Sequence, residues 1–213
     1  MLMAPSASAA QTKPHLSFVK GGATISFSME GGSSPDDTTG NTQSIRINAP
    51  AGGGASAYTY GTDETLVAIR GLKLSQITHL GFDSKGYLGA GAPRISLGTT
   101  GPLGDHTFFL SASSCNDATS DGWRTSDFSD SAQSPGTSTG CLISDQSGNT
   151  FTSIQAAAIM YPDDVVVSNP NDWFLIVDES PSLTYVDRLT VQNWMWTRGG
   201  DPGIVNCNVG TCI

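Results

Sequence analysis

Acidic side chains are the residues of this sequence best suited to bind a metal ion. Asp187 lies in a strand-like segment at 184–191, while Glu30 and Asp37 follow the end of an earlier alternating segment. Calcium takes roughly six to eight oxygen ligands, which carboxylates and loop carbonyls can supply. We therefore name Asp187, Glu30 and Asp37 as candidate ligands of a structural Ca²⁺. The alternative is that Asp187 accepts hydrogen bonds from nearby backbone N–H groups, and no DxDxDG calcium loop occurs.

Aromatic side chains form the second group that could bind a ligand. Trp194 and Trp196 lie two residues apart, so on a strand they share one face. Val191 is expected to point inward, and the two tryptophans then point outward, where flat rings can stack on sugars. Trp123 and Tyr87 lie in predicted loops, where binding residues are common. The alternatives are that the C-terminal tail covers the tryptophans and that the loop aromatics fill their own loops.

No catalytic set is recognisable in the sequence. A glycosidase needs two positioned carboxylates, and the glutamates are few, namely Glu30, Glu64 and Glu179. The GxSxG match at 136–140 lies in a long polar segment and follows no apolar strand, so it does not have the strand-turn-helix context of a nucleophile elbow. We therefore name no catalytic residue, and keep a polysaccharide hydrolase or lyase only as an alternative.

The four cysteines predict two disulfides. Cys115 and Cys141 share one polar segment, and Cys207 and Cys212 share the C-terminal tail, so we expect pairing within each segment. The first bridge would close a loop of about 25 residues and stabilise the fold by about 3 kcal/mol. A zinc site is the alternative, but there is no CxxC motif and the histidines are distant in sequence.

The segment 173–196 organises the elements that would position these residues. An apolar run at 173–177 predicts a buried strand, and a turn containing Pro181 separates it from a second strand at 183–191. In that second strand Val186 and Leu189 are three residues apart, although strand side chains alternate faces. Burying both requires one extra residue near 187–188, which is a β-bulge.

Most of the remaining chain also predicts strands. Alternating or apolar stretches occur at 21–30, 45–47, 57–61, 66–69, 72–82, 93–97, 107–112 and 165–168. One short helix is expected at 152–160, because Ile154, Ala157, Ala158 and Tyr161 fall at helical spacing. We expect long loops at 83–92 and 113–140. Many short strands separated by turns are typical of an all-β antiparallel sandwich, and we expect the jelly-roll type.

The net charge and the terminal segments of the sequence indicate which partners to expect and where the protein acts. A net charge of −9 on 213 residues argues against nucleic-acid binding, which needs a basic surface. Small residues around Ala7-Ser8-Ala9 resemble a signal cleavage pattern. We expect a signal-peptide remnant or disordered arm at 1–20, a β-sandwich at 21–197 and a disulfide-stapled tail at 198–213. No run of 18 apolar residues occurs, so we expect no membrane span.

Three stretches together resemble a class of secreted bacterial β-sandwich proteins. They are LKLSQITHLGFD at 72–83, GAGAPRISL at 89–97 and TYVDRLTV at 184–191. The last is also similar to the closing strand of jelly-roll carbohydrate-binding modules. The resemblance implies a jelly-roll-like sandwich, secretion and binding of glycans or surfaces, in a class where a structural Ca²⁺ is common.

These observations predict a secreted, extracellular, non-catalytic module that binds polysaccharide or cell-surface glycan. The first alternative is an extracellular structural or adhesive protein that self-associates through its N-terminal arm or an open strand edge. The second is the polysaccharide hydrolase or lyase named above.

Overall fold

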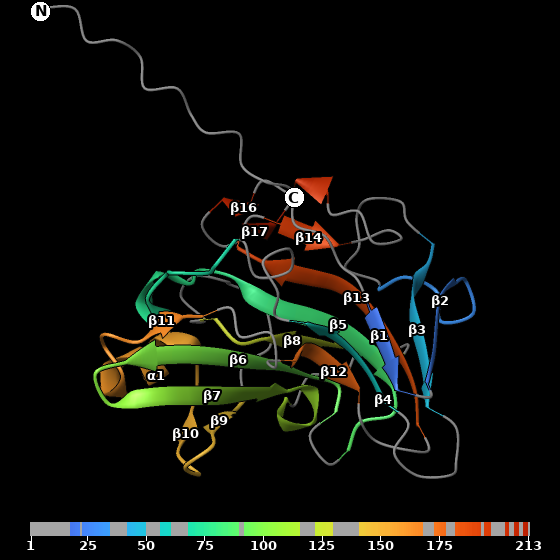
Figure 1. The fold of residues 1–213 in the computed structure, drawn as a ribbon. Coiled ribbons are helices and arrows are strands. Elements are labelled where there is room, and N and C mark those ends of the chain that lie inside the picture. The colour runs from blue at the N-terminus through green and yellow to red at the C-terminus, as the bar shows by residue number, and fades with distance from the viewer. Residues whose placement is uncertain are drawn as a thin grey trace, which may run out of the picture.

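The computed structural model describes two antiparallel β-sheets and one α-helix (Figure 1). The described residues are 18–21, 23–34, 42–49, 56–60, 68–89, 92–115, 122–129, 141–167, 173–177, 182–192, 194–196, 203–204, 207–208 and 211–212. Both sheets contribute to one hydrophobic core. The all-β sandwich is therefore confirmed, and its jelly-roll type stays a prediction.

The first sheet has the order β1-β4-β12-β6-β7-β9-β10, and β11 pairs with β6. Its longest pairing joins β6 and β7, which run antiparallel over eight register pairs around the turn at Pro102 and Leu103. The strands are β1 (Phe18–Gly21), β4 (Ser56–Tyr60), β6 (Arg94–Gly101), β7 (Gly104–Ser111), β9 (Ile143–Asp145), β10 (Thr150–Phe151), β11 (Val165–Val166) and β12 (Trp173–Val177).

The second sheet is organised around β13 (Ser182–Val191), which pairs with β3, β5 and β14. From β13 the sheet extends to β2 through β3, to β8 through β5, and to β15 through β14. The remaining strands of this sheet are β2 (Thr24–Ser28), β3 (Ser44–Ala49), β5 (Leu80–Gly86), β8 (Trp123–Asp127), β14 (Trp194–Trp196) and β15 (Gly203–Ile204). A separate ribbon consists of β16 (Cys207–Asn208) and β17 (Thr211–Cys212).

The predicted helix is confirmed as α1 (Ile154–Met160). Ser153 caps its first turn, because its side chain accepts a hydrogen bond from the Ala156 amide at 3.0 Å. Ile154, Ala157 and Ala158 face the core as their spacing predicts. The helix ends before Pro162, since the residue preceding a proline disfavours helical backbone angles. Two short 3₁₀ turns, η1 (Leu74–Gln76) and η2 (Ala112–Ser114), precede and follow strands of the two sheets.

The β-bulge predicted in the strand at 183–191 is confirmed. The pairing of β13 with β5 shifts register between Asp187 and Thr190, and Arg188 has a φ of +47°. As a result Val186 and Leu189 are both fully buried, although three residues separate them. The preceding strand, β12, lies in the first sheet, so the chain passes from one sheet to the other between Val177 and Ser182.

Some sequence expectations need correction. Residues 68–71 form a turn where a strand at 66–69 was expected, and β5 continues to Gly86, inside the loop expected at 83–92. Strand β8 lies inside the loop expected at 113–140. It was missed because its core-facing position is the fully buried Ser126, so the strand has no apolar alternation. Strand β1 begins at Phe18, within the expected arm, and β15 pairs the expected tail with the sandwich.

The disulfide Cys115–Cys141 is present, and both cysteines are buried at the edge of the core. Cys207 and Cys212 are register partners in the β16–β17 ribbon, while their side chains lie outside the described part. Among the described residues, no helix has both the length and the apolar character needed to cross a bilayer.

Removing the first disulfide tests its contribution to stability. The double variant Cys115→Ser/Cys141→Ser should lower the free energy of unfolding by about 3 kcal/mol, because the unfolded chain regains the freedom of a long loop. Urea denaturation measures the change. Cys207→Ser/Cys212→Ser is the matched control and should have a smaller effect, since its loop is short. Equal effects of the two double variants would contradict this account.

Candidate functional site

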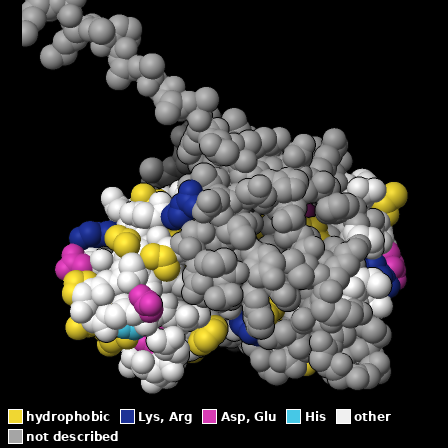
Figure 2. All heavy atoms as spheres, viewed as in Figure 1, with side chains coloured by type: hydrophobic (Ala, Val, Ile, Leu, Met, Phe, Trp, Pro, Cys, Tyr) yellow, Lys and Arg dark blue, Asp and Glu magenta, His cyan; other side chains and the backbone are white. Residues whose placement is uncertain are grey.

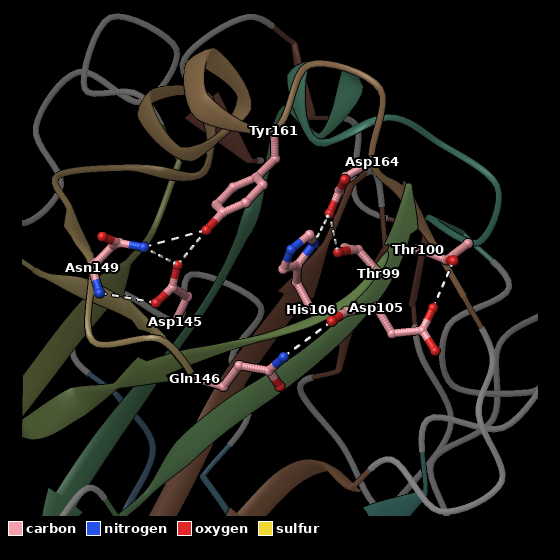
Figure 3. Close-up of polar contacts among 9 residues, drawn as sticks. All are labelled: Thr99, Thr100, Asp105, His106, Asp145, Gln146, Asn149, Tyr161 and Asp164. Atoms are coloured by element: carbon pink, nitrogen blue, oxygen red, sulfur yellow. Dashed lines mark hydrogen bonds and ion pairs between the residues drawn. The ribbon is translucent and has the colours of Figure 1, made fainter. Parts of the chain in front are cut away.

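A cluster of buried polar residues lies at the end of the first sheet beside α1 (Figure 3). Strand β7 contributes His106 and β9 contributes Asp145. The connection between α1 and β11 contributes Tyr161 and Asp164. All four residues are largely buried: the His106 side chain is 11% exposed and the others less. Chain positions more than fifty residues apart are therefore brought into one cluster.

Asp164 forms one half of this cluster. Its Oδ2 accepts a hydrogen bond from Thr99 Oγ1 at 2.6 Å and lies 2.8 Å from His106 Nδ1. Thr99 and His106 are register partners on β6 and β7, so adjacent strands present both groups to the same carboxylate. Gly101 packs against Asp164 so closely that a Cβ atom at this position would overlap its carboxylate. The pair of His106 and Asp164 fixes the orientation of the imidazole ring.

Asp145 forms the other half and accepts hydrogen bonds on both oxygens. Oδ1 accepts from the amides of Ser147 and Asn149, at 2.8 and 2.9 Å, which closes the β9–β10 turn. Oδ2 accepts from the Tyr161 hydroxyl at 2.6 Å and from Asn149 Nδ2 at 2.8 Å. The Tyr161 ring lies 4.4 Å from the His106 ring, centroid to centroid, and so joins the two halves.

These hydrogen bonds set the charge of the cluster. Burial alone would raise the pKa of Asp145, but the hydrogen bonds from Tyr161, Asn149 and Ser147 bring its pKa below the ordinary value. The same hydrogen bond to Asp145, together with burial, raises the pKa of Tyr161. Asp145 is therefore ionised and Tyr161 neutral over the whole physiological range.

A histidine oriented by a carboxylate is a unit that enzymes use as a general base. Within the described residues, however, the hydroxyls of Thr99 and Tyr161 are both donated to carboxylates. The arrangement ties β7, the β9–β10 turn and the α1–β11 connection together, which is a structural role. Sequence reasoning missed it because no short spacing links the residues concerned.

The predicted calcium ligand Asp187 has a different set of partners. Its Oδ2 accepts a hydrogen bond from the Ser34 amide at 2.8 Å, and its Oδ1 accepts one from the Arg188 amide at 2.9 Å. Asp187 thus accepts backbone N–H groups at the bulge, as the alternative interpretation expects. Its register partner Asp83 accepts from Ser34 Oγ and pairs with Arg188 Nη1 at 3.1 Å.

The other candidate calcium ligands do not join Asp187 in a described cluster. Glu30 is exposed and pairs with Arg46 at 3.0 Å, and Asp37 lies outside the described residues. Within the described ranges, no group of three or more histidine, cysteine, aspartate or glutamate side chains could hold a metal ion. The segment after β2 contacts Asp187 through the Ser34 amide.

The four aromatic residues predicted to bind a ligand lie on different elements of the fold. Trp123 begins β8 instead of lying in a loop, and it is 1% exposed. Tyr87 follows β5 and is half-buried. Trp194 and Trp196 are register partners of Val191 and Leu189, and their side chains lie outside the described part.

Polar side chains also form a row across three strands of the second sheet, on the face opposite the core. Ile45 and Val186 face the core, so Arg46 and Tyr185, which alternate with them, face the other way. Lys85 on β5 is the register partner of Tyr185 and extends this row. The segment 29–34 lies against it, since Gly31 contacts the Tyr185 ring and its carbonyl accepts from Lys85 Nζ at 3.4 Å.

Comparisons of the chain with protein-family models, curated proteins and solved structures found no match. Function therefore has to be inferred from the geometry and chemistry described above.

The variant Tyr161→Phe tests the Asp145 network. It should lower the free energy of unfolding at neutral pH by about 1.5–3 kcal/mol, the usual effect of losing a hydrogen bond to a charged group. Because the pKa of Asp145 is lower folded than unfolded, this contribution is present above the unfolded pKa. It is lost as pH falls through the folded pKa, so wild type and variant should converge in acid.

Urea denaturation at a series of pH values measures this convergence. Tyr185→Phe is the matched control, since it removes the hydroxyl of a buried tyrosine in the other sheet. A Tyr161→Phe defect that stays the same from neutral pH into strong acid would contradict the assignment.

Proposed function

We propose that this protein is a secreted, non-catalytic module that binds polysaccharide or cell-surface glycan. The observation that supports it best is the cross-strand row of Arg46, Tyr185 and Lys85 on the face of the second sheet opposite the core. Arg46 and Lys85 are partly exposed, and their guanidinium and ammonium groups can donate hydrogen bonds to sugar hydroxyls, while the buried Tyr185 ring packs against the segment at 29–34. A sheet holds such groups at fixed spacing, as a repeating polymer requires.

Residues near this row could also contact a glycan. Glu30 is exposed beside Arg46 and adds a hydrogen-bond acceptor. Tyr87 follows directly after β5, while Trp194 and Trp196 lie on β14 of the same sheet, opposite the core-facing Val191 and Leu189. The mixture of cationic, acidic and aromatic groups suits a polar ligand better than a lipid or a nucleic acid.

Affinity electrophoresis in gels containing soluble polysaccharides tests this proposal. Arg46→Ala and Lys85→Ala should each weaken retardation several-fold with little change in the melting temperature, because both side chains are partly exposed. Trp194→Ala and Trp196→Ala should weaken it by about tenfold, as expected for the loss of a stacked ring. Lys73→Ala, a partly exposed lysine outside this row, is the control.

Two outcomes would count against the proposal. If no polysaccharide in a broad panel retards the wild-type protein, the protein is not a polysaccharide-binding module. A large fall in melting temperature for the tryptophan variants would mean that these rings belong to the core, and would remove them from the binding face.

Self-association is the second candidate function, and exposed apolar side chains support it. Ile159 and Met160 at the end of α1 are 83% and 50% exposed, and Leu103 in the β6–β7 turn is 74% exposed. In Figure 2, apolar side chains are visible at the end of the molecule where Figure 1 has α1 and the ends of β6 and β7. Such side chains are common where proteins contact one another.

Light scattering tests this alternative. The wild-type protein should form dimers or larger species at high concentration, and Ile159→Asp should convert them to monomers because it places a charge in the contact. Leu142→Asp, at another exposed leucine, should leave the assembly intact. A wild-type protein that remains a monomer at every concentration would contradict self-association.

A further inference from the structure

Gln192 joins two parts of the second sheet through an unusual set of contacts. It lies in the turn between β13 and β14 and has a φ of +55°, a left-handed conformation that is uncommon for residues other than glycine. Its amide donates to the His79 carbonyl at 2.7 Å. Its side-chain Nε2 donates to the Gln76 carbonyl at 3.0 Å. The carboxamide is therefore held firmly against the segment that leads into β5.

The oxygen of this carboxamide accepts hydrogen bonds from two consecutive backbone amides. Oε1 lies 2.7 Å from the Thr78 amide and 3.2 Å from the His79 amide. Two N–H groups directed at one carbonyl oxygen polarise the carbonyl and stabilise negative charge on that oxygen, as in an oxyanion hole. The Gln192 carbonyl carbon is thereby made more electrophilic.

A hydroxyl and a base accompany these donors. Thr78 Oγ1 lies 2.8 Å from Gln192 Oε1 and 3.1 Å from His79 Nδ1. His79 is 8% exposed, and its Nε2 has no hydrogen-bond partner among the described atoms. Burial lowers the pKa of His79 despite the opposing charge of Asp127, so the imidazole is neutral near pH 7 and can accept a proton.

We propose that Thr78 and Gln192 form an intramolecular ester, with His79 as the proton carrier. The Thr78 oxygen attacks Cδ of Gln192, and the hydroxyl proton passes to His79 Nδ1. The tetrahedral intermediate then expels Nε2, which takes that proton from His79 and leaves as ammonia. One C–O bond forms, one C–N bond breaks, and no oxidant or other reactant is required.

The geometry needs only a small adjustment for the attack. Thr78 Oγ1 already contacts the carboxamide at its oxygen, and the terminal torsion of a glutamine side chain is soft. A rotation about this torsion leaves Cδ in place but turns the plane of the carboxamide, so that one face of the carbonyl group is presented to the hydroxyl, while the two backbone amides stay fixed in the protein. The contact between nucleophile and electrophile spans 114 positions in sequence, so the ester would cross-link the beginning of β5 to the β13–β14 turn.

Intact-mass spectrometry of the purified full-length chain tests the cross-link. The mass should be one ammonia lower than the sequence predicts after its disulfides are allowed for. A protease digest should yield one linked species containing Thr78 and Gln192, which alkaline hydroxylamine separates. Full mass together with separate, unmodified Thr78 and Gln192 peptides would overturn the proposal.

Variants identify the groups responsible. Gln192→Glu keeps the size and acceptor oxygens of the side chain but removes the amide electrophile, so no link should form. Thr78→Ser keeps the hydroxyl and should still link, whereas Thr78→Val should not. His79→Gln should slow link formation by about 100-fold or more, the usual contribution of a general base. A linked species that persists in Gln192→Glu would also overturn the assignment.

Two controls exclude other sources of the same mass loss. Gln155→Glu alters a glutamine that contacts the Ile77 carbonyl and, within the described part of the chain, no hydroxyl, and this variant should remain linked. An N-terminal Gln11, if processing exposed it, would lose ammonia by cyclisation. That loss would persist in Gln192→Glu and would map to the N-terminal peptide, so it is distinguishable from the ester.

Discussion

The extra residue in β13 is the constraint on which the second sheet depends. It lets Val186 and Leu189 both enter the core, and it turns Asp187 and Arg188 toward the opposite face. There Asp187 holds the amide of Ser34, and Arg188 pairs with Asp83. A strand without the bulge would expose either Val186 or Leu189 and would leave two buried carboxylates side by side without a nearby cation.

Buried aspartates also hold separate segments together in the first sheet. Asp145 and Asp164 each gather donors from several segments, and the rings of His106 and Tyr161 bridge them. Only 14% of the residues in this chain are charged, so most loop contacts depend on hydroxyl, amide and backbone groups. A few fully hydrogen-bonded carboxylates therefore fix loops that contain little apolar surface.

Local patterns in the sequence predict most strands, the helix and the bulge. The period-2 alternation at 107–112 and the three-residue step from Val186 to Leu189 are visible without a structure. Strand β8 is not visible in this way, because Ser126 occupies its core-facing position. The partners of Asp187 and His106 also escape prediction, since they depend on which strands pair. The position of Trp123 opposite Lys85 on a strand, and not in a loop, likewise depends on strand pairing that the local sequence does not reveal.

Strand pairing in the second sheet has a consequence for the synthesis of the protein. Strand β3 lies between β2 and β13, and the residues of β13 are translated more than 130 positions after those of β3. Until then β3 has one open edge and an uncovered apolar side, a state prone to join other chains. Stable structure in this sheet has to wait for release of nearly the whole polypeptide.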